Sequence, residues 1–327
     1  MINPFQGKTV LITGGTGSFG SNFVKHLLVV TKPKKLVIFS RDEFKQHYLA
    51  KELNDERTRF FLGDIRDLGR LQRAFQGIDI IIHAAALKQV PALEYNPLEA
   101  VKTNILGTQN IIEAAIDQQV KRVIFISTDK AVQPINLYGA TKLCAEKLWI
   151  SANAYSPKIT KFSVVRYGNV VGSRGSIVEW LKQNHQTPVV HITDPKMTRF
   201  WMSLEKSFAL ITFAIKEMVG GEIFIPRIPS MRLVDIFKVL TPRAKQKIIG
   251  ARPGEKIHEI LFTEHEARRT FVIGDYFVIV PEHHTWNTGD PYQKYLKRGK
   301  AIEDNFIFSS ETNKLWLSPE QLKKIVA

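Results

Sequence analysis

A tyrosine and a lysine four residues apart, Tyr138 and Lys142, follow closely on the segment Ser127–Lys130, whose sequence is Ser-Thr-Asp-Lys. Residues at i and i+4 share one face of a helix, which we expect to begin near Leu137. A phenol has an unperturbed pKa of about 10, so Tyr138 can act as a base near neutral pH only if a cation stabilises its phenolate. Lys142 can be that cation. This stretch therefore indicates acid–base catalysis beside a redox centre, although the pair alone could also be a solvated helix face.

The element that must position these groups is the apolar run Arg122–Ser127, which is predicted to be a strand buried on both faces. Similar runs recur in the first half of the chain, and helical stretches separate them. The predicted strands are TVLIT, KLVIF, RFFLG, IDIIIHAA, RVIFIS and KFSVVRYG, and the predicted helices include Asn22–Val30, Leu68–Phe75, Pro97–Gln118 and Thr141–Ala154. This alternation predicts an α/β fold, a doubly wound parallel sheet of the Rossmann type, with ligands at the carboxyl ends of the strands.

The alternation of strands and helices ends near Gly172, where proline becomes more frequent and the elements become short and mixed. We expect residues 1–171 to form a dinucleotide-binding domain to which later parts of the chain return. Residues 172–284 are expected to form mainly a smaller substrate-binding lobe, and residues 285–327 a C-terminal extension. The extension should end in a helix, because Ser318 is a good N-cap and Pro319 is a good first helical residue.

A glycine-rich turn follows the first predicted strand and precedes a helix, which is the context that a dinucleotide-binding fingerprint requires. Its glycines have GxxGxxG spacing, which allows a tight turn and a close approach of the backbone to a pyrophosphate at a helix N-terminus. The residues expected to contact the cofactor there are Gly14, Thr16, Gly17, Ser18, Phe19 and Gly20.

The end of the second predicted strand indicates which dinucleotide binds. An NAD-type site usually has an acid there, but this chain has Ser40-Arg41. Arg41, with Lys45 one helical turn later, suits a 2′-phosphate and favours NADP, whereas Asp42 could still reach a ribose hydroxyl and leaves NAD open. Further expected cofactor contacts are Asp64 and Ile65 beside the adenine and the small residues Ala84, Ala85 and Ala86, which could instead serve close packing.

The composition is that of an ordinary globular chain, with 327 residues, 44% hydrophobic and 24% charged. One cysteine, Cys144, excludes a disulfide framework and fits a cytoplasmic location. No apolar run is long enough to be an integral membrane segment. The net charge of +15 is spread along the chain, and its densest cluster, Lys294–Lys300, is interpreted as solvated surface, so a nucleic-acid partner is not expected.

Taken together, these motifs resemble those of the extended short-chain dehydrogenase/reductases that act on nucleotide sugars, and within them the inverting UDP-N-acetylglucosamine 4,6-dehydratases. The resemblance covers almost the whole chain. It rests on GGTGSFG at Gly14, SRDEFKQ at Ser40, HAAALKQVP at His83, STDKA at Ser127, QPINLYGATK at Gln133, RYGNVVGSRGS at Arg166, MTRFW at Met197, IPSMR at Ile228 and RPGEKIHE at Arg252. It implies UDP-N-acetylglucosamine as substrate, formation of the L-arabino 4-keto sugar, a place in pseudaminic acid biosynthesis and a homo-oligomer.

The resemblance also implies roles for the residues around Tyr138. Tyr138 and Lys142 would oxidise C4, and Thr128 would hold the C4 oxygen. Dehydratases that retain the C5 configuration typically have Asp-Glu after the threonine, with the carboxylate as the C5 base. This chain has Asp129-Lys130 instead. Lys130 is therefore expected to be the C5 base, neutral because nearby positive charges and burial disfavour its ammonium form, and Asp129 the acid that protonates the departing C6 hydroxyl.

The family motifs place the nucleotide-sugar contacts later in the chain, where arginine suits a diphosphate. The expected substrate-binding residues are Lys88, Asn169, Arg174, Arg199, Arg252 and Glu255, and the arginines could alternatively be surface salt-bridge partners. His258, Glu259 and His265 lack the HExxH spacing, so they are interpreted as helix surface and no metal site is expected.

Other functions remain open at this point. Another dehydratase or 5-epimerase of the same fold could act on a different UDP-sugar and feed a different deoxyamino sugar. A simple C4 epimerase needs no acid–base pair such as Asp129-Lys130. A non-catalytic NADP-binding regulatory protein, using the basic surface, would not need the pair Tyr138 and Lys142.

Overall fold

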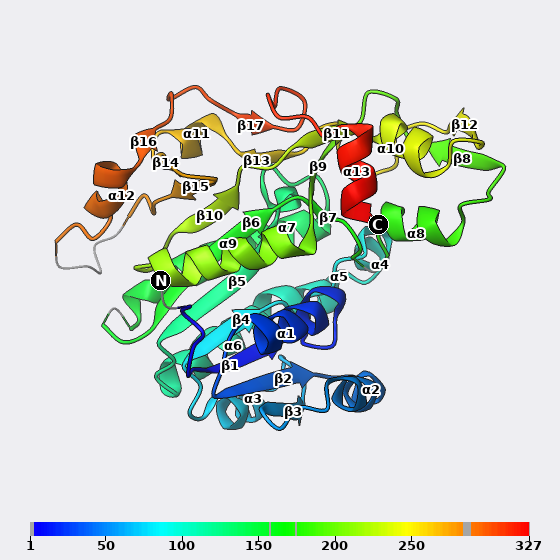
Figure 1. Ribbon diagram of the computed structural model, residues 1–327. Helices are drawn as coiled ribbons and strands as arrows, with labels where there is room; N and C mark the ends of the chain where they lie inside the picture. The colour runs from blue at the N-terminus through cyan, green and yellow to red at the C-terminus, as the bar shows by residue number, and fades with distance from the viewer. Residues whose placement is uncertain (1–2, 157, 174, 284–288, 327) are drawn as a thin grey trace.

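The computed structural model describes residues 3–156, 158–173, 175–283 and 289–326. Within them the main sheet has ten strands, in the order β16-β14-β15-β10-β6-β5-β4-β1-β2-β3 (Figure 1). The strands from β3 to β10 are parallel, and β15, β14 and β16 continue the sheet with antiparallel pairing. The bounds are β1 Thr9–Thr13, β2 Lys35–Ser40, β3 Thr58–Leu62, β4 Ile80–His83, β5 Arg122–Thr128, β6 Lys161–Tyr167, β10 Ile223–Pro226, β14 Thr270–Ile273, β15 Tyr276–Ile279 and β16 Lys300–Ala301.

Helices cover both faces of this sheet, so the predicted doubly wound fold is confirmed. On one face α1 (Ser18–Val30) packs beside α9 (Leu204–Glu217), and on the other α3 (Leu68–Phe75), α6 (Gly107–Asp117) and α7 (Leu137–Ser151) pack against one another (Figure 1). The central strands are apolar along their length because both of their faces are buried. The remaining helices on this half are α2 Glu43–Leu53, α4 Val90–Tyr95 and α5 Pro97–Ala100, which continues through the π-helical turn Val101–Leu106 into α6.

A smaller lobe with its own hydrophobic cluster lies beside the carboxyl ends of the strands, at the upper right of Figure 1. It contains α8 (Ile177–Gln183), β8 (Val189–Ile192), α10 (Leu233–Leu240), β12 (Lys245–Ile248) and α13 (Pro319–Val326). The predicted terminal helix is α13, which packs against α10, and the Ser318 hydroxyl accepts a hydrogen bond from the Gln321 N–H. The last part of the chain thus contributes both to the lobe, through α13, and to the main sheet, through β16.

Short elements connect the sheet to the lobe. A three-stranded sheet of β11, β9 and β7 starts directly after β6. The pair β13 and β17 lies next to it, since the ring centres of Phe200 and Phe308 are 4.8 Å apart. Their bounds are β7 Asn169–Val170, β9 Thr198–Met202, β11 Ser230–Arg232, β13 Ile260–Phe262 and β17 Phe308–Ser309, with α11 Glu264–Ala267 and α12 Gln293–Arg298 nearby in the chain. Among the described residues no helix has the length and apolar character needed to cross a bilayer.

Candidate active site

A cavity of about 600 Å³ opens at the carboxyl ends of β1, β4, β5 and β6, the edge at which doubly wound sheets bind ligands. Many of the residues predicted to bind cofactor or substrate meet there. The predicted residues that line it are Gly14, Thr16, Gly17, Ser18, Phe19, Gly20, Lys45, Ala84, Ala85, Ala86, Lys88, Thr128, Lys130, Tyr138, Lys142 and Asn169. The cavity thus joins the glycine turn to the acid–base segment.

The glycine turn lies directly on the alanine segment. Gly14 has a φ of +65°, and a Cβ there would approach the Ala85 backbone to 3.0 Å. A Cβ on Gly20 would meet the Gly14 carbonyl oxygen at 2.5 Å, so α1 can begin this close to the turn only without that side chain. The Thr13 hydroxyl accepts hydrogen bonds from the Ala84 and Ala85 N–H groups. Close packing of the alanines and a floor for the cofactor are therefore compatible here.

Tyr138 stands in the first turn of α7, and the helix start is fixed by specific contacts. The Asn136 side chain caps the helix by accepting from the Gly139 N–H at 2.8 Å. A Cβ on Gly139 would lie 2.1 Å from the Lys130 carbonyl oxygen, so this glycine lets the Lys130 turn approach the helix. Burial raises the pKa of Tyr138 to about 12, and the positive charge of Lys130 acts in the opposite direction.

The cation beside Tyr138 in this structure is Lys130. Lys142 lies instead against the central strand β5, where its Nζ donates to the Ile126 carbonyl at 2.6 Å and lies 3.8 Å from the centre of the Phe125 ring. Burial lowers the pKa of Lys142 to about 7, although Glu146 opposes this. Lys142 still lines the cavity, but the sequence analysis did not foresee that Lys130 would be the charge acting on the phenol.

Lys130 is held by two carboxylates. Its Nζ lies 3.0 Å from Asp129 Oδ1 and 3.3 Å from Glu259 Oε1, and 27% of its side chain is exposed. Burial lowers the pKa of Lys130, but Asp129 and Glu259 outweigh it, and the pKa lies above its usual range. The expectation that the surroundings favour the neutral amine was therefore wrong for this state of the site, because it counted the nearby cations and missed Glu259.

Asp129 is fully buried and does not line the cavity itself. The Thr128 hydroxyl, which does line it, donates to Asp129 Oδ1 at 2.9 Å. The other carboxylate oxygen, Oδ2, has no hydrogen-bond partner within the described part of the chain. Any proton exchanged between Asp129 and a ligand would thus pass through Thr128 or Lys130.

Only some of the residues predicted to bind the nucleotide sugar line the cavity. Lys88 and Asn169 line the cavity, and Arg252 is exposed outside it. Arg199 is buried and donates to the carbonyls of Thr198, Lys256 and Ile257, so its guanidinium holds backbone in this state. Glu255 lies 3.5 Å from Arg199. The remaining predicted residue, Arg174, lies outside the described residues.

Of the two residues predicted to bind a 2′-phosphate, one lines the cavity and the other does not. Lys45 lines the cavity but forms an ion pair with Asp42, the N-cap of α2. Arg41 lies 3.5 Å from Asp64 without lining the cavity. Ile65 is buried in the core. A phosphate at this edge would compete with Asp42 and Asp64 for both cations.

Three further features bear on the site. Tyr167, which the sequence analysis missed, lines the cavity beside Tyr138, and a tyrosine at the end of a strand was the only available signal.

Glu259 was wrongly interpreted as helix surface; it directly precedes β13 and is 2% exposed. Among the described residues no cluster of three or more His, Cys, Asp or Glu side chains could hold a metal ion.

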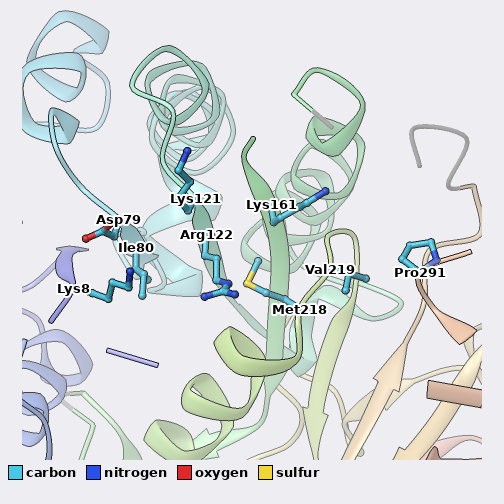
Figure 2. Close-up of a pocket in the computed structure, with 9 residues that line it drawn as sticks. All are labelled: Lys8, Asp79, Ile80, Lys121, Arg122, Lys161, Met218, Val219 and Pro291. Carbon is cyan, nitrogen blue, oxygen red and sulfur yellow. The ribbon is translucent and has the colours of Figure 1, made fainter. Parts of the chain in front are cut away.

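A second cavity, of about 540 Å³, lies at the opposite, amino ends of the strands. It is lined by Lys8, Asp79, Ile80, Lys121, Arg122, Lys161, Met218, Val219 and Pro291 (Figure 2). Figure 2 shows the side chains of Lys121 and Lys161 pointing away from the Arg122 guanidinium. These side chains do not converge on one point, whereas the predicted catalytic residues other than Asp129 line the first cavity.

Comparison with known proteins agrees with this geometry. The family model described as polysaccharide biosynthesis protein matches residues 10–281. The chain belongs to this family. A protein from Campylobacter jejuni named UDP-N-acetylglucosamine 4,6-dehydratase (inverting) is 46% identical over 98% of both chains. A UDP-glucose 4-epimerase from Rickettsia conorii is 39% identical, over 98% of this chain and 96% of its own.

Among solved structures, Pen from Bacillus thuringiensis superimposes with a TM-score of 0.89 at 39% identity, covering 98% of both chains. The predicted resemblance to nucleotide-sugar dehydratases of the extended short-chain dehydrogenase/reductase type is thereby confirmed. The relatives carry two different activities, so the choice between dehydration and epimerisation depends on the residues of the cavity.

Proposed function

We propose that the protein is a UDP-N-acetylglucosamine 4,6-dehydratase that inverts the configuration at C5. The observation that carries this is the presence of two separate acid–base groups, Tyr138 and Lys130, in one cavity with a dinucleotide-binding turn. An oxidation at C4 needs one base and the removal of the C5 proton needs a second. The product is UDP-2-acetamido-2,6-dideoxy-β-L-arabino-hex-4-ulose.

Each step of the reaction is assigned to a residue of the site. Tyr138, as phenolate beside the Lys130 charge, takes the proton of the C4 hydroxyl, and Thr128 holds the C4 oxygen. The new ketone acidifies C5. The Lys130 ammonium first passes its proton to Asp129 Oδ1, 3.0 Å away, which leaves a neutral amine and a carboxylic acid. The amine takes the C5 proton, the acid passes its proton through Thr128 Oγ1 to the C6 hydroxyl, and water leaves. C5 then takes a proton from solvent on the opposite face, which inverts it, and Tyr138 gives its proton back to solvent. The sum is redox-neutral with loss of one water.

The cavity suits a dinucleotide because Gly14 and Gly20 allow the tight turn that precedes α1, and the N-terminus of such a helix can bind a pyrophosphate. A nicotinamide cofactor bound there would take hydride from C4 and return it to C6. We propose NADP, held at its 2′-phosphate by Lys45 and Arg41 after they leave Asp42 and Asp64. Because the hydride is returned, the cofactor is expected to stay bound through the cycle.

The same resemblance supports a place in pseudaminic acid biosynthesis, a homo-oligomeric assembly and a cytoplasmic location, which we include in the proposal. A C4 epimerase is the second candidate, favoured by the similarity to the Rickettsia enzyme. It would need Tyr138 but would leave Lys130, with its two carboxylates, without a role.

The deciding experiment incubates purified protein with UDP-N-acetylglucosamine in deuterated water without added cofactor and analyses the product by NMR. The dehydratase gives a 4-keto-6-deoxy sugar with deuterium at an inverted C5. An epimerase gives a 4-epimer without deuterium at C5, and that result would overturn the proposal.

A further inference from the structure

The second carboxylate at Lys130 belongs to Glu259, from a distant part of the chain. Glu259 is 2% exposed and does not line the cavity, whereas Lys130 does. Its Oε1 lies 3.3 Å from Lys130 Nζ. Lys130 therefore stands between the ligand space on one side and a buried acid on the other.

Glu259 is firmly placed for this contact. Its backbone N–H donates to Ser310 Oγ at 2.9 Å, and its carbonyl accepts from the Ser310 N–H at 2.8 Å. Nearby, Lys256 Nζ donates to the carbonyl of Val132, which follows the Lys130 turn directly. The segment that carries Glu259 is thus tied both to the end of β17 and to the catalytic turn.

The carboxylate of Glu259 is incompletely satisfied. Its Oε2 has no hydrogen-bond partner among the described residues. Lys256 Nζ lies 3.9 Å from Oε2, and Arg199 Nε lies 3.8 Å from Oε1. A buried carboxylate oxygen without a hydrogen bond is unfavourable, so packing alone does not explain an acid at this position. Burial accordingly raises the pKa of Glu259.

We propose that Glu259 is a positioning residue for Lys130: it holds the lysine nitrogen at the cavity wall and sets the pH at which that nitrogen loses its proton. This inference rests on the proposed function, in which Lys130 is the C5 base. The charged or titratable groups that face Lys130 are Asp129 from its own turn, Glu259, Arg199, Lys256 and Tyr138. Asp129 and Glu259 favour the ammonium form, and Arg199 opposes it.

Removing one carboxylate should therefore make Lys130 deprotonate at lower pH. In Glu259→Gln the amide keeps the size of the side chain and loses the charge. An opposite charge within about 4–6 Å shifts a pKa by about 1–3 units. The acidic limb of the pH–rate profile, where the exchange rate rises as Lys130 loses its proton, should therefore lie about 1–3 pH units lower in Glu259→Gln than in wild type. A weaker base takes a proton more slowly, so the plateau rate at high pH should fall as well.

The experiment measures C5 deuterium exchange from UDP-N-acetylglucosamine against pH for wild type, Glu259→Gln and Glu311→Gln. Glu311 is a matched control because it is 60% exposed and contacts His258 instead of Lys130. We expect the limb to move to lower pH in Glu259→Gln alone, with KM little changed. If the acidic limb of the Glu259→Gln profile stays at the wild-type pH and exchange is reduced equally at every pH, the role of Glu259 is structural and the inference is overturned.

Glu259→Asp keeps the charge at a longer distance and should give a smaller displacement, which provides a second test if Glu259→Gln is poorly folded. An unshifted limb in Glu259→Asp together with a folding failure of Glu259→Gln would also count against the inference. The proposed function fails separately, if wild type does not exchange C5 or if exchange survives the removal of Lys130.

Discussion

Replacing Lys130 in two ways should separate C4 oxidation from C5 proton removal. Lys130→Arg keeps a positive charge beside Tyr138 but supplies no base, because a guanidinium does not lose its proton in proteins. Lys130→Met removes both the charge and the base. The cavity of about 600 Å³ in front of this partly exposed side chain leaves space for the larger guanidinium.

The expected magnitudes follow from the surroundings of Tyr138, whose pKa burial raises to about 12 even with Lys130 present. Loss of a neighbouring charge should raise the pKa of Tyr138 by about 1–3 units and lower the phenolate population by about 10–1000-fold. C4 oxidation should slow by that factor in Lys130→Met and by less than about tenfold in Lys130→Arg. C5 exchange should fall by about 10²–10⁴-fold in both variants.

The assay is a single turnover with UDP-N-acetylglucosamine in deuterated buffer. Absorbance of the reduced nicotinamide reports C4 oxidation, and NMR of the recovered sugar reports deuterium at C5. Reduced cofactor should accumulate in Lys130→Arg, since the later steps are blocked. Wild-type deuterium incorporation in Lys130→Arg would refute Lys130 as the base, and unchanged oxidation in Lys130→Met would refute its effect on Tyr138.

Further outcomes are expected. Tyr138→Phe should abolish C4 oxidation while UDP-sugar affinity, measured by calorimetry, stays within a few-fold, since the lost hydroxyl acts mainly in the transition state; wild-type turnover would remove Tyr138 from the mechanism. Denatured wild-type protein should release NADP(H), and recovery of NAD alone would contradict the role of Arg41. Gly139→Ala should lower stability by about 1–3 kcal/mol in denaturant titrations, because its Cβ meets the Lys130 carbonyl at 2.1 Å. The control Gly69→Ala, which meets nothing closer than 3.6 Å, should not.

Much of the fold could be predicted because the strands and helices are specified locally. The run Arg122–Ser127 is apolar and β-branched, and it forms β5 with one additional residue, Thr128. The start of α7 was placed correctly near Leu137 because Tyr138 and Lys142 needed a common face. The π-helical turn Val101–Leu106 could not be predicted, since no proline or glycine within it marks a change in helix type.

The parts of the candidate site that lie at strand ends could be predicted from motifs. The ion pairs between residues that are far apart in the sequence could not. Gly14 and Tyr138 were found by their spacing after strands, and Lys130 was found because its motif resembles that of the dehydratase family. The contact between Lys130 and Glu259 joins residues that the sequence separates widely, and only the folded chain brings them within 3.3 Å. The same is true of Arg199, whose motif suggested a phosphate ligand while its donors are used by backbone carbonyls.

Because Lys130 faces Tyr138 as well as Asp129 and Glu259, C4 oxidation and removal of the C5 proton are coupled electrostatically. While Tyr138 is a phenolate, its negative charge stabilises the Lys130 ammonium. When the phenolate takes the C4 hydroxyl proton, that stabilisation ends, and the pKa of Lys130 falls. The C5 proton becomes acidic at the same moment, since the C4 ketone has just formed. A lysine held protonated by carboxylates can therefore become a base after oxidation, which accounts for a C5 base that is charged in the resting site.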